Sequence, residues 1–214
     1  YLEFIVFLLA ILLRYIGIFP GYPLMHPDEP TSFNTAIYML EHSYKPNRFD
    51  YPAGMAFINA VVYKTIFLPI QLTRLFITRP EMLFAYVTLD KPAVESSYEF
   101  LFGHRRMYAV YWTRFIHATF GWLTVVILYF VAKRLFNRTT ALAAAVFLAV
   151  NHRHVLGSHI GVPDVLNGFF ALLALLAAIR LIEKKTLRRY IFVGITAGLS
   201  FSIKYQPFAF LPLL

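Results

Sequence analysis

The chain of 214 residues contains no cysteine and few charged residues. The lack of cysteine excludes a disulfide framework and a thiolate metal site, and it leaves the redox compartment without a marker. Only 14% of the residues are charged, whereas 59% are hydrophobic and 18% aromatic, with a mean hydropathy of +0.61. This composition excludes an ordinary soluble domain and predicts an all-helical integral membrane protein that crosses the bilayer repeatedly.

Negative charge is scarcer still, with 11 acidic residues against 20 lysines and arginines and a formal net charge of +9. In a polytopic membrane protein such cations gather in cytoplasmic loops and beside anionic headgroups, so the excess does not indicate a nucleic-acid partner. Two short loops, 133–138 and 184–189, hold most of the clustered cations. We expect both loops in the cytoplasm and the connections between them outside.

Apolar segments of helix length give the expected spans. The first, Leu2 to Phe19, lacks a small-residue cleavage site and is therefore not a signal peptide. Later spans are expected at 107–133, 141–156, 164–182 and 190–206. A further run begins near Phe208, and we therefore expect the intact protein to be longer. The chain divides into a first span (1–20), an external loop with juxtamembrane helices (21–106) and further spans (107–214).

The external loop is expected to contain two helices. An amphipathic helix is predicted near Thr31 to Ser43, with Thr31 or Ser32 as its N-cap. An apolar segment from Pro52 to Ile70 follows, and its polar and helix-breaking residues make it a poor spanning helix. We place this segment in the membrane interface.

Two neighbouring carboxylates, Asp28 and Glu29, lie a few residues past the end of the first span. The expected topology places them on the same membrane face as Asp50, the 152–164 connection and Lys204. Ionisable residues at membrane depth are costly and usually line a cavity, so this grouping predicts one external site. The alternative is that Asp28 and Glu29 only begin a helix, where acids favour the positive end of the dipole.

Taken in order, these residues resemble the C-type glycosyltransferases, multi-spanning enzymes that use a polyprenyl-phosphate sugar. The resemblance is strongest to the branch of protein O-mannosyltransferases and lipid A aminoarabinose transferases, and it covers essentially the whole chain. The elements that carry it are Pro27-Asp28-Glu29, Phe49-Asp50-Tyr51-Pro52, Arg114, Ser158-His159 with Pro163-Asp164, and Gly194-Ile195-Thr196-Ala197-Gly198 leading into Lys204-Tyr205. It implies that residues 1–214 form the N-terminal module of such an enzyme, with its lipid-phosphate site on the outer face.

The resemblance assigns roles that the chemistry of sugar transfer supports. A base must remove the acceptor proton as the anomeric centre becomes electron-poor, and Asp28 is the candidate. Glu29 is expected to orient the acceptor or to share this role. Lys204 is expected to contact the leaving lipid phosphate. The alternative for Lys204 is a cation that reaches the interface from a helix end.

Further residues are expected to line the cavity: Asp164, Asp50, Arg114, His159 and Tyr205. Arg114 lies in an apolar helix and should pair with an acid. Arg14 is expected to reach the interface or to pair locally. In the aminoarabinose branch a lysine follows the acid at position 50, but here Tyr51 stands there. This departure argues against aminoarabinose as the sugar, and Arg48 is the candidate replacement cation.

The expected ligands are a polyprenyl-phosphate sugar and an acceptor hydroxyl or phosphate on a protein, lipid or glycan. Imidazole is a common metal ligand, and the chain has candidates in His26, His152, His154 and His159. The branch that the chain resembles is not expected to need a metal, however, so we expect no metal or other cofactor. A lipid or ion transporter also concentrates charge in the membrane, yet the sequence shows no internal repeat. A non-catalytic scaffold is the third alternative. Convergence of Asp28 and Lys204 on one pocket distinguishes the enzyme from both alternatives, and the enzyme interpretation fails if the two residues do not converge.

Overall fold

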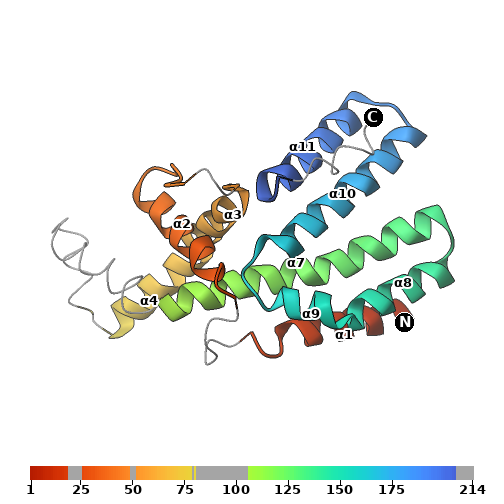
Figure 1. Ribbon diagram of the computed structural model, residues 1–214. Coiled ribbons are helices and arrows are strands. Elements are labelled where there is room, and N and C mark those ends of the chain that lie inside the picture. The colour runs from red at the N-terminus through yellow and green to blue at the C-terminus, as the bar shows by residue number, and fades with distance from the viewer. Residues whose placement is uncertain (19–25, 49–51, 79, 81–105, 206–214) are drawn as a thin grey trace.

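The computed structural model describes residues 1–18, 26–48, 52–78, 80 and 106–205 (Figure 1). All regular structure in these ranges is helical, as the composition predicts. The helices are α1 (Leu2–Tyr15), α2 (Glu29–Glu41), α3 (Gly54–Val62), the π-helical turn η1 (Tyr63–Phe67), α4 (Leu68–Thr78), α7 (Arg106–Leu135), α8 (Arg138–Val150), α9 (His152–Ser158), α10 (Pro163–Glu183) and α11 (Leu187–Ile203).

One group of helices consists of α1, α7 and α8. Ala141, Ala145 and Ala149 form a stripe of small residues on α8, and they are fully buried against Val6 and Ala10 of α1 and against α7. Small side chains let helix backbones approach closely, which replaces the hydrophobic effect as the source of helix association in lipid. Exposed apolar side chains cover the outer face of α1, as expected of a surface that faces lipid or further spans.

A second group consists of α10 and α11 packed on α7. Phe120 of α7 contacts the rings of Phe169 and Phe170 at centroid distances of 4.9 and 5.6 Å. At the far end of this group, Arg134 of α7 forms an ion pair with Glu183 of α10. The pair joins the α7–α8 turn to the α10–α11 turn, so the two cation-rich loops lie at one end, as predicted. We call this the cationic end and the opposite one the site end.

The α2–α4 region forms a lobe beyond the site end (Figure 1). Its core is apolar and includes Phe33, Met39 and Phe67, packed against the first turns of α7. Tyr63 donates a hydrogen bond to the main-chain oxygen of Ala109 at 2.8 Å, which fixes the π-helical turn on α7. The lobe thus extends from the site end along the N-terminal part of α7.

Three helical segments are long and apolar enough to cross a membrane: Gly54–Thr78, Ala109–Leu135 and Pro163–Glu183. The protein is therefore an integral membrane protein. The segment from Pro52 to Ile70, which its polar and helix-breaking residues mark as a poor spanning helix, continues as helix to Thr78 and is apolar enough over this length to be a candidate span. Its described contacts are nevertheless with α2, the start of α7 and the end of α11.

Several helix ends differ from those predicted, and each has a local cause. The expected span 141–156 is divided at Asn151, whose extended backbone ends α8 and whose side chain accepts a hydrogen bond from the His154 main-chain N–H to begin α9. Helix α2 begins at Glu29 with Asp28 as N-cap, rather than at Thr31 or Ser32, because Pro30 suits the first helical turn. Helix α1 already ends at Tyr15, just before Gly17, which adopts a φ of +94°.

Candidate functional site

A buried ion pair joins the lobe to the bundle at the site end. Arg114 of α7 donates from Nε and Nη2 to the two carboxylate oxygens of Glu29, each at 2.9 Å. The main-chain N–H of Gly161 also donates to Glu29 Oε1 at 2.9 Å. Glu29 and Arg114 are 1% and 0% exposed. The expectation that Arg114 pairs with an acid is confirmed, and both oxygens of Glu29 are engaged.

The segment 159–162 depends on this pair for its position. Ser32 of α2 donates to the main-chain oxygen of Gly161 at 2.9 Å, so α2 holds both polar groups of that residue. A Cβ atom at position 161 would lie only 2.6 Å from Cγ2 of Thr113. Glycine is therefore required for the close approach of this segment to α7.

This close approach gives a prediction for Gly161→Ala. The added methyl group forces the segment away from α7 and from Glu29, so we expect a loss of about 1–3 kcal/mol in the free energy of unfolding. Gly168→Ala in α10 is the matched control, because a Cβ there meets nothing within 4 Å and alanine favours the helix. Unfolding in detergent measures both. Equal stability of the two variants would contradict the proposed packing.

Asp28 lies next to Glu29 in sequence but in a different environment. It is the N-cap residue of α2, yet its side chain makes no capping hydrogen bond. Its side chain is 54% exposed, and His26 Nδ1 lies 3.7 Å from Asp28 Oδ2 and accepts a hydrogen bond from the Asp28 main-chain N–H at 3.2 Å. The alternative in which the two acids only begin a helix fits their positions, since Asp28 is the N-cap residue and Glu29 lies in the first turn of α2, where the helix dipole favours acids.

Lys204 and Asp164 form the second charged pair at the site end. Lys204 terminates α11, and Asp164 lies in the first turn of α10. Lys204 Nζ donates to Asp164 Oδ1 at 2.5 Å, and the two side chains are 37% and 63% exposed. Lys204 is therefore held at the end of its helix while remaining accessible.

The start of α3 closes the space between the lobe and α11. A Cβ on Gly54 would lie 2.5 Å from the main-chain oxygen of Ser202, so α3 and α11 are in close contact. Met55 packs with Leu166 and Ile203 in the adjoining core. Contacts thus link α2, α3, the 159–162 segment and the ends of α10 and α11 at one place.

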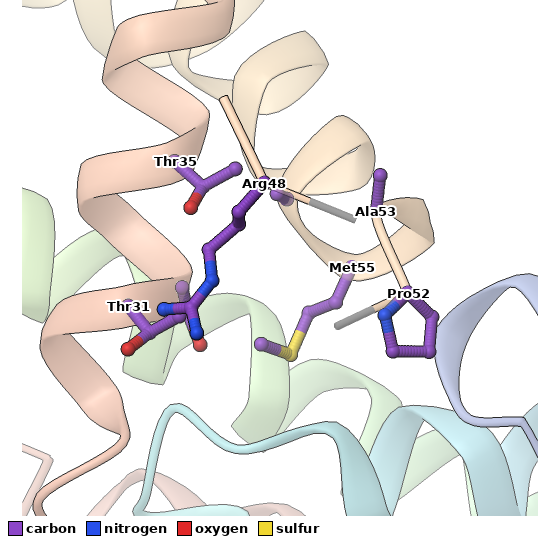
Figure 2. A pocket seen from close by; sticks show the side chains of 8 residues that line it. Thr31, Thr35, Arg48, Pro52, Ala53 and Met55 are labelled. Atoms are coloured by element: carbon purple, nitrogen blue, oxygen red, sulfur yellow. The ribbon is translucent and has the colours of Figure 1, made fainter. Parts of the chain in front are cut away.

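A small pocket adjoins this junction. It is lined by Thr31, Ser32, Thr35, Arg48, Pro52, Ala53, Met55 and Ala56. Figure 2 shows the Arg48 side chain running along α2 toward Thr31, with Met55 on the facing wall. Arg48, the candidate replacement cation, therefore lines a pocket whose wall includes Ser32, the partner of Gly161.

His159 and Arg14 occupy positions that the sequence did not reveal. His159 Nε2 lies 3.0 Å from the main-chain oxygen of Leu13, and partial burial lowers the pKa of this histidine, which favours a neutral imidazole. Arg14 is fully buried and donates to the last-turn carbonyls of α8 at Leu148 and Ala149. It also contacts His154 Nδ1 at 2.9 Å. These contacts join α1 to α8 and α9.

The remaining candidates are only partly described. Asp50 lies outside the described residues, and Tyr205 is exposed and packs on Phe201 with ring centroids 5.3 Å apart. The described residues show no direct contact between Asp28 and Lys204, and neither residue lines a described pocket, so their expected convergence on one pocket stays a prediction. No group of three potential metal ligands occurs among the described residues. The lack of a metal requirement stays a prediction.

Sequence reasoning missed Ser32 and Gly161 as the residues that connect α2 to the 159–164 segment. Ser32 had a signal only as a possible helix cap, and Gly161 had none apart from its residue type.

Comparison with known proteins places these features in a family. The family model described as dolichyl-phosphate-mannose-protein mannosyltransferase matches residues 100–214, more than half of the chain. The matched part includes Arg114, Asp164 and Lys204, whereas Asp28 and Glu29 precede it. No curated protein and no solved structure matches the chain significantly. The chain belongs to the dolichyl-phosphate-mannose-protein mannosyltransferase family and is thus a membrane glycosyltransferase that uses a lipid-phosphate sugar donor.

Proposed function

We propose that the chain transfers a sugar from a polyprenyl-phosphate donor to a hydroxyl or phosphate acceptor on a protein, lipid or glycan at the external membrane face. With a hydroxyl acceptor, Asp28 takes the proton while the acceptor oxygen bonds to the anomeric carbon. The bond between that carbon and the phosphate oxygen breaks, and its electron pair leaves with the lipid phosphate. The unequal environments of Asp28 and Glu29 carry this proposal.

The argument for Asp28 as base rests on what each carboxylate already binds. Glu29 is buried, and Arg114 and Gly161 occupy its oxygens. Asp28 is half exposed and leaves its helix uncapped. A general base must reach its acceptor proton within hydrogen-bond distance, which an exposed and uncommitted carboxylate can do. Glu29 then acts as a positioning residue that fixes the start of α2, and with it Asp28.

Lys204 is the proposed contact for the donor phosphate. Negative charge grows on the phosphate as the bond to the sugar breaks, and a fixed cation stabilises it. Asp164 holds the ammonium group at the end of α11, and the exposure of both side chains lets a phosphate oxygen approach the same ammonium group. Arg48 in the adjoining pocket is the proposed second cation for the lipid phosphate or the sugar.

The orientation follows from charge. The cationic end carries the turns 133–138 and 184–189, which the positive-inside rule assigns to the cytoplasm. Helices α7, α10 and α11 run between this end and the site end, so the site end faces outward in this topology. The acidic pair and Lys204 then meet a donor whose phosphate lies at the outer interface.

The test is sugar transfer by the full-length enzyme in lipid with a panel of radiolabelled polyprenyl-phosphate sugars. The family description makes a mannose-type donor the first to examine. Tyr51, in place of the lysine of the aminoarabinose branch, leads us to expect no turnover of the aminoarabinose donor. Failure of every donor would overturn the proposal in favour of a transporter or scaffold.

For Lys204→Ala we expect a loss of about tenfold to a hundredfold in kcat/KM for the donor. A hydrogen bond to a charged group contributes about 1.5–3 kcal/mol, which corresponds to that range. Lys185→Ala, in an exposed turn at the cationic end, removes the same charge away from the site. Steady-state kinetics with varied donor concentration compare the two variants. An equal effect of both would show that Lys204 acts only through the net charge.

A further inference from the structure

A pocket with four arginines lies at the cationic end, away from the candidate site. It is lined by Arg134 of α7, Ala177 and Arg180 of α10, and Arg188, Arg189 and Phe192 of α11. The 17 residues of α11 separate it from Lys204, a distance of about 25 Å along the helix. The pocket is therefore separate from the proposed donor-phosphate contact.

The arginines of this pocket exceed the negative charge beside them. Glu183, which is paired with Arg134, is the acid that faces the group. Arg189 donates to the main-chain oxygen of Arg180. In the described part of the chain, the side chains of Arg180 and Arg188 make no hydrogen bond or ion pair. Four guanidinium groups against one carboxylate leave an excess of three positive charges.

The geometry points to an anionic ligand with an apolar part. A guanidinium group presents paired N–H donors that match phosphate oxygens, and several of them around one pocket favour a phosphate over a carboxylate. Ala177 and Phe192 give the pocket an apolar wall. Leu187 and Ile191 are exposed on α11, the helix that carries Phe192. Free inorganic phosphate has no apolar part that could pack against such a wall.

We propose that this pocket binds the phosphate headgroup of an acidic phospholipid, with the acyl chains against the exposed apolar side chains of α11. Basic pockets between membrane helices at the cytoplasmic side are suited to such headgroups, and the positive-inside rule places this end there. The bound lipid bridges α7, α10 and α11 where Arg134 and Glu183 already join two of them. This site does not depend on the proposed sugar transfer.

The test is lipid retention by the full-length protein in detergent, followed by native mass spectrometry during titration with phosphatidylglycerol or phosphatidylcholine. The variant is Arg180→Gln/Arg188→Gln, and the matched control is Lys184→Gln/Lys185→Gln, which removes the same charge from the turn between α10 and α11, outside the pocket. We expect the arginine variant to bind phosphatidylglycerol roughly 30-fold more weakly, the effect of two juxtamembrane cations. We expect only a small change in the control and no change for phosphatidylcholine.

Two results would overturn the proposal. If the arginine and lysine variants weaken phosphatidylglycerol binding equally, the lipid is attracted by the net positive charge of this end and not by the pocket. Displacement of phosphatidylglycerol by inorganic phosphate at equal concentration would mean that the pocket binds a soluble anion. Helical content measured by circular dichroism shows whether the variants are folded, and sugar transfer is measured separately, so failure of one proposal is distinguishable from failure of the other.

Discussion

Asp28→Asn should abolish nearly all sugar transfer while leaving the protein folded. Asparagine keeps the size of the side chain but cannot accept the acceptor proton, and general-base catalysis contributes about 10²- to 10⁴-fold. Because the Asp28 side chain is half exposed and makes no capping bond, its replacement removes no buried contact. We therefore expect kcat to fall by about that factor with no change in the unfolding transition.

The control for this prediction lies on the same helix. Glu41→Gln removes a carboxylate from the exposed last turn of α2 and should leave transfer unchanged. Retention of more than a small part of the activity by Asp28→Asn would exclude it as the base.

The helical architecture follows from composition, and the placement of the cationic end follows from charge. Loops 133–138 and 184–189 each carry several cations, so the sequence predicts that both lie at the same membrane face. The Arg134–Glu183 ion pair confirms that they lie together. Such features depend on residue type alone. They are therefore visible in a single sequence.

Other features depend on partners that leave no trace in sequence. Arg14 binds main-chain carbonyls of α8, and Glu29 binds the main-chain N–H of Gly161; every residue carries such groups, so no pattern marks the ones used. The break at Asn151 arises from one cap within an otherwise apolar run. The predicted span of 141–156 was therefore too long.

The different roles of Asp28 and Glu29 are likewise not visible in the sequence. Successive residues at a helix start point about 100° apart, so Asp28 and Glu29 face different surroundings although they are adjacent. The sequence assigned the base to Asp28 and left Glu29 as an assistant. Only the position of Arg114 and Gly161 shows which carboxylate is enclosed.

Glu29→Gln should lower stability strongly, in contrast to Asp28→Asn. It leaves the Arg114 guanidinium buried without a counter-charge, and breaking a buried pair by removing one partner costs about 3–5 kcal/mol. Arg114→Met should have a comparable effect, because it leaves the carboxylate uncompensated. Thermal unfolding in detergent, followed by circular dichroism, measures both.

A double-mutant cycle separates this positioning role from catalysis. In Glu29→Gln/Arg114→Met the buried charges are both absent, so we expect much of the lost stability to return, because replacing a whole buried pair is far less costly than breaking it. The hydrogen bond from Gly161 to position 29 can persist through the glutamine oxygen, which keeps the start of α2 in place. The folded double variant should then retain measurable sugar transfer, with Asp28 as the base. If instead Glu29→Gln unfolds like the wild-type enzyme and loses transfer completely, Glu29 takes part in proton transfer, and the assignment of the base to Asp28 alone is wrong.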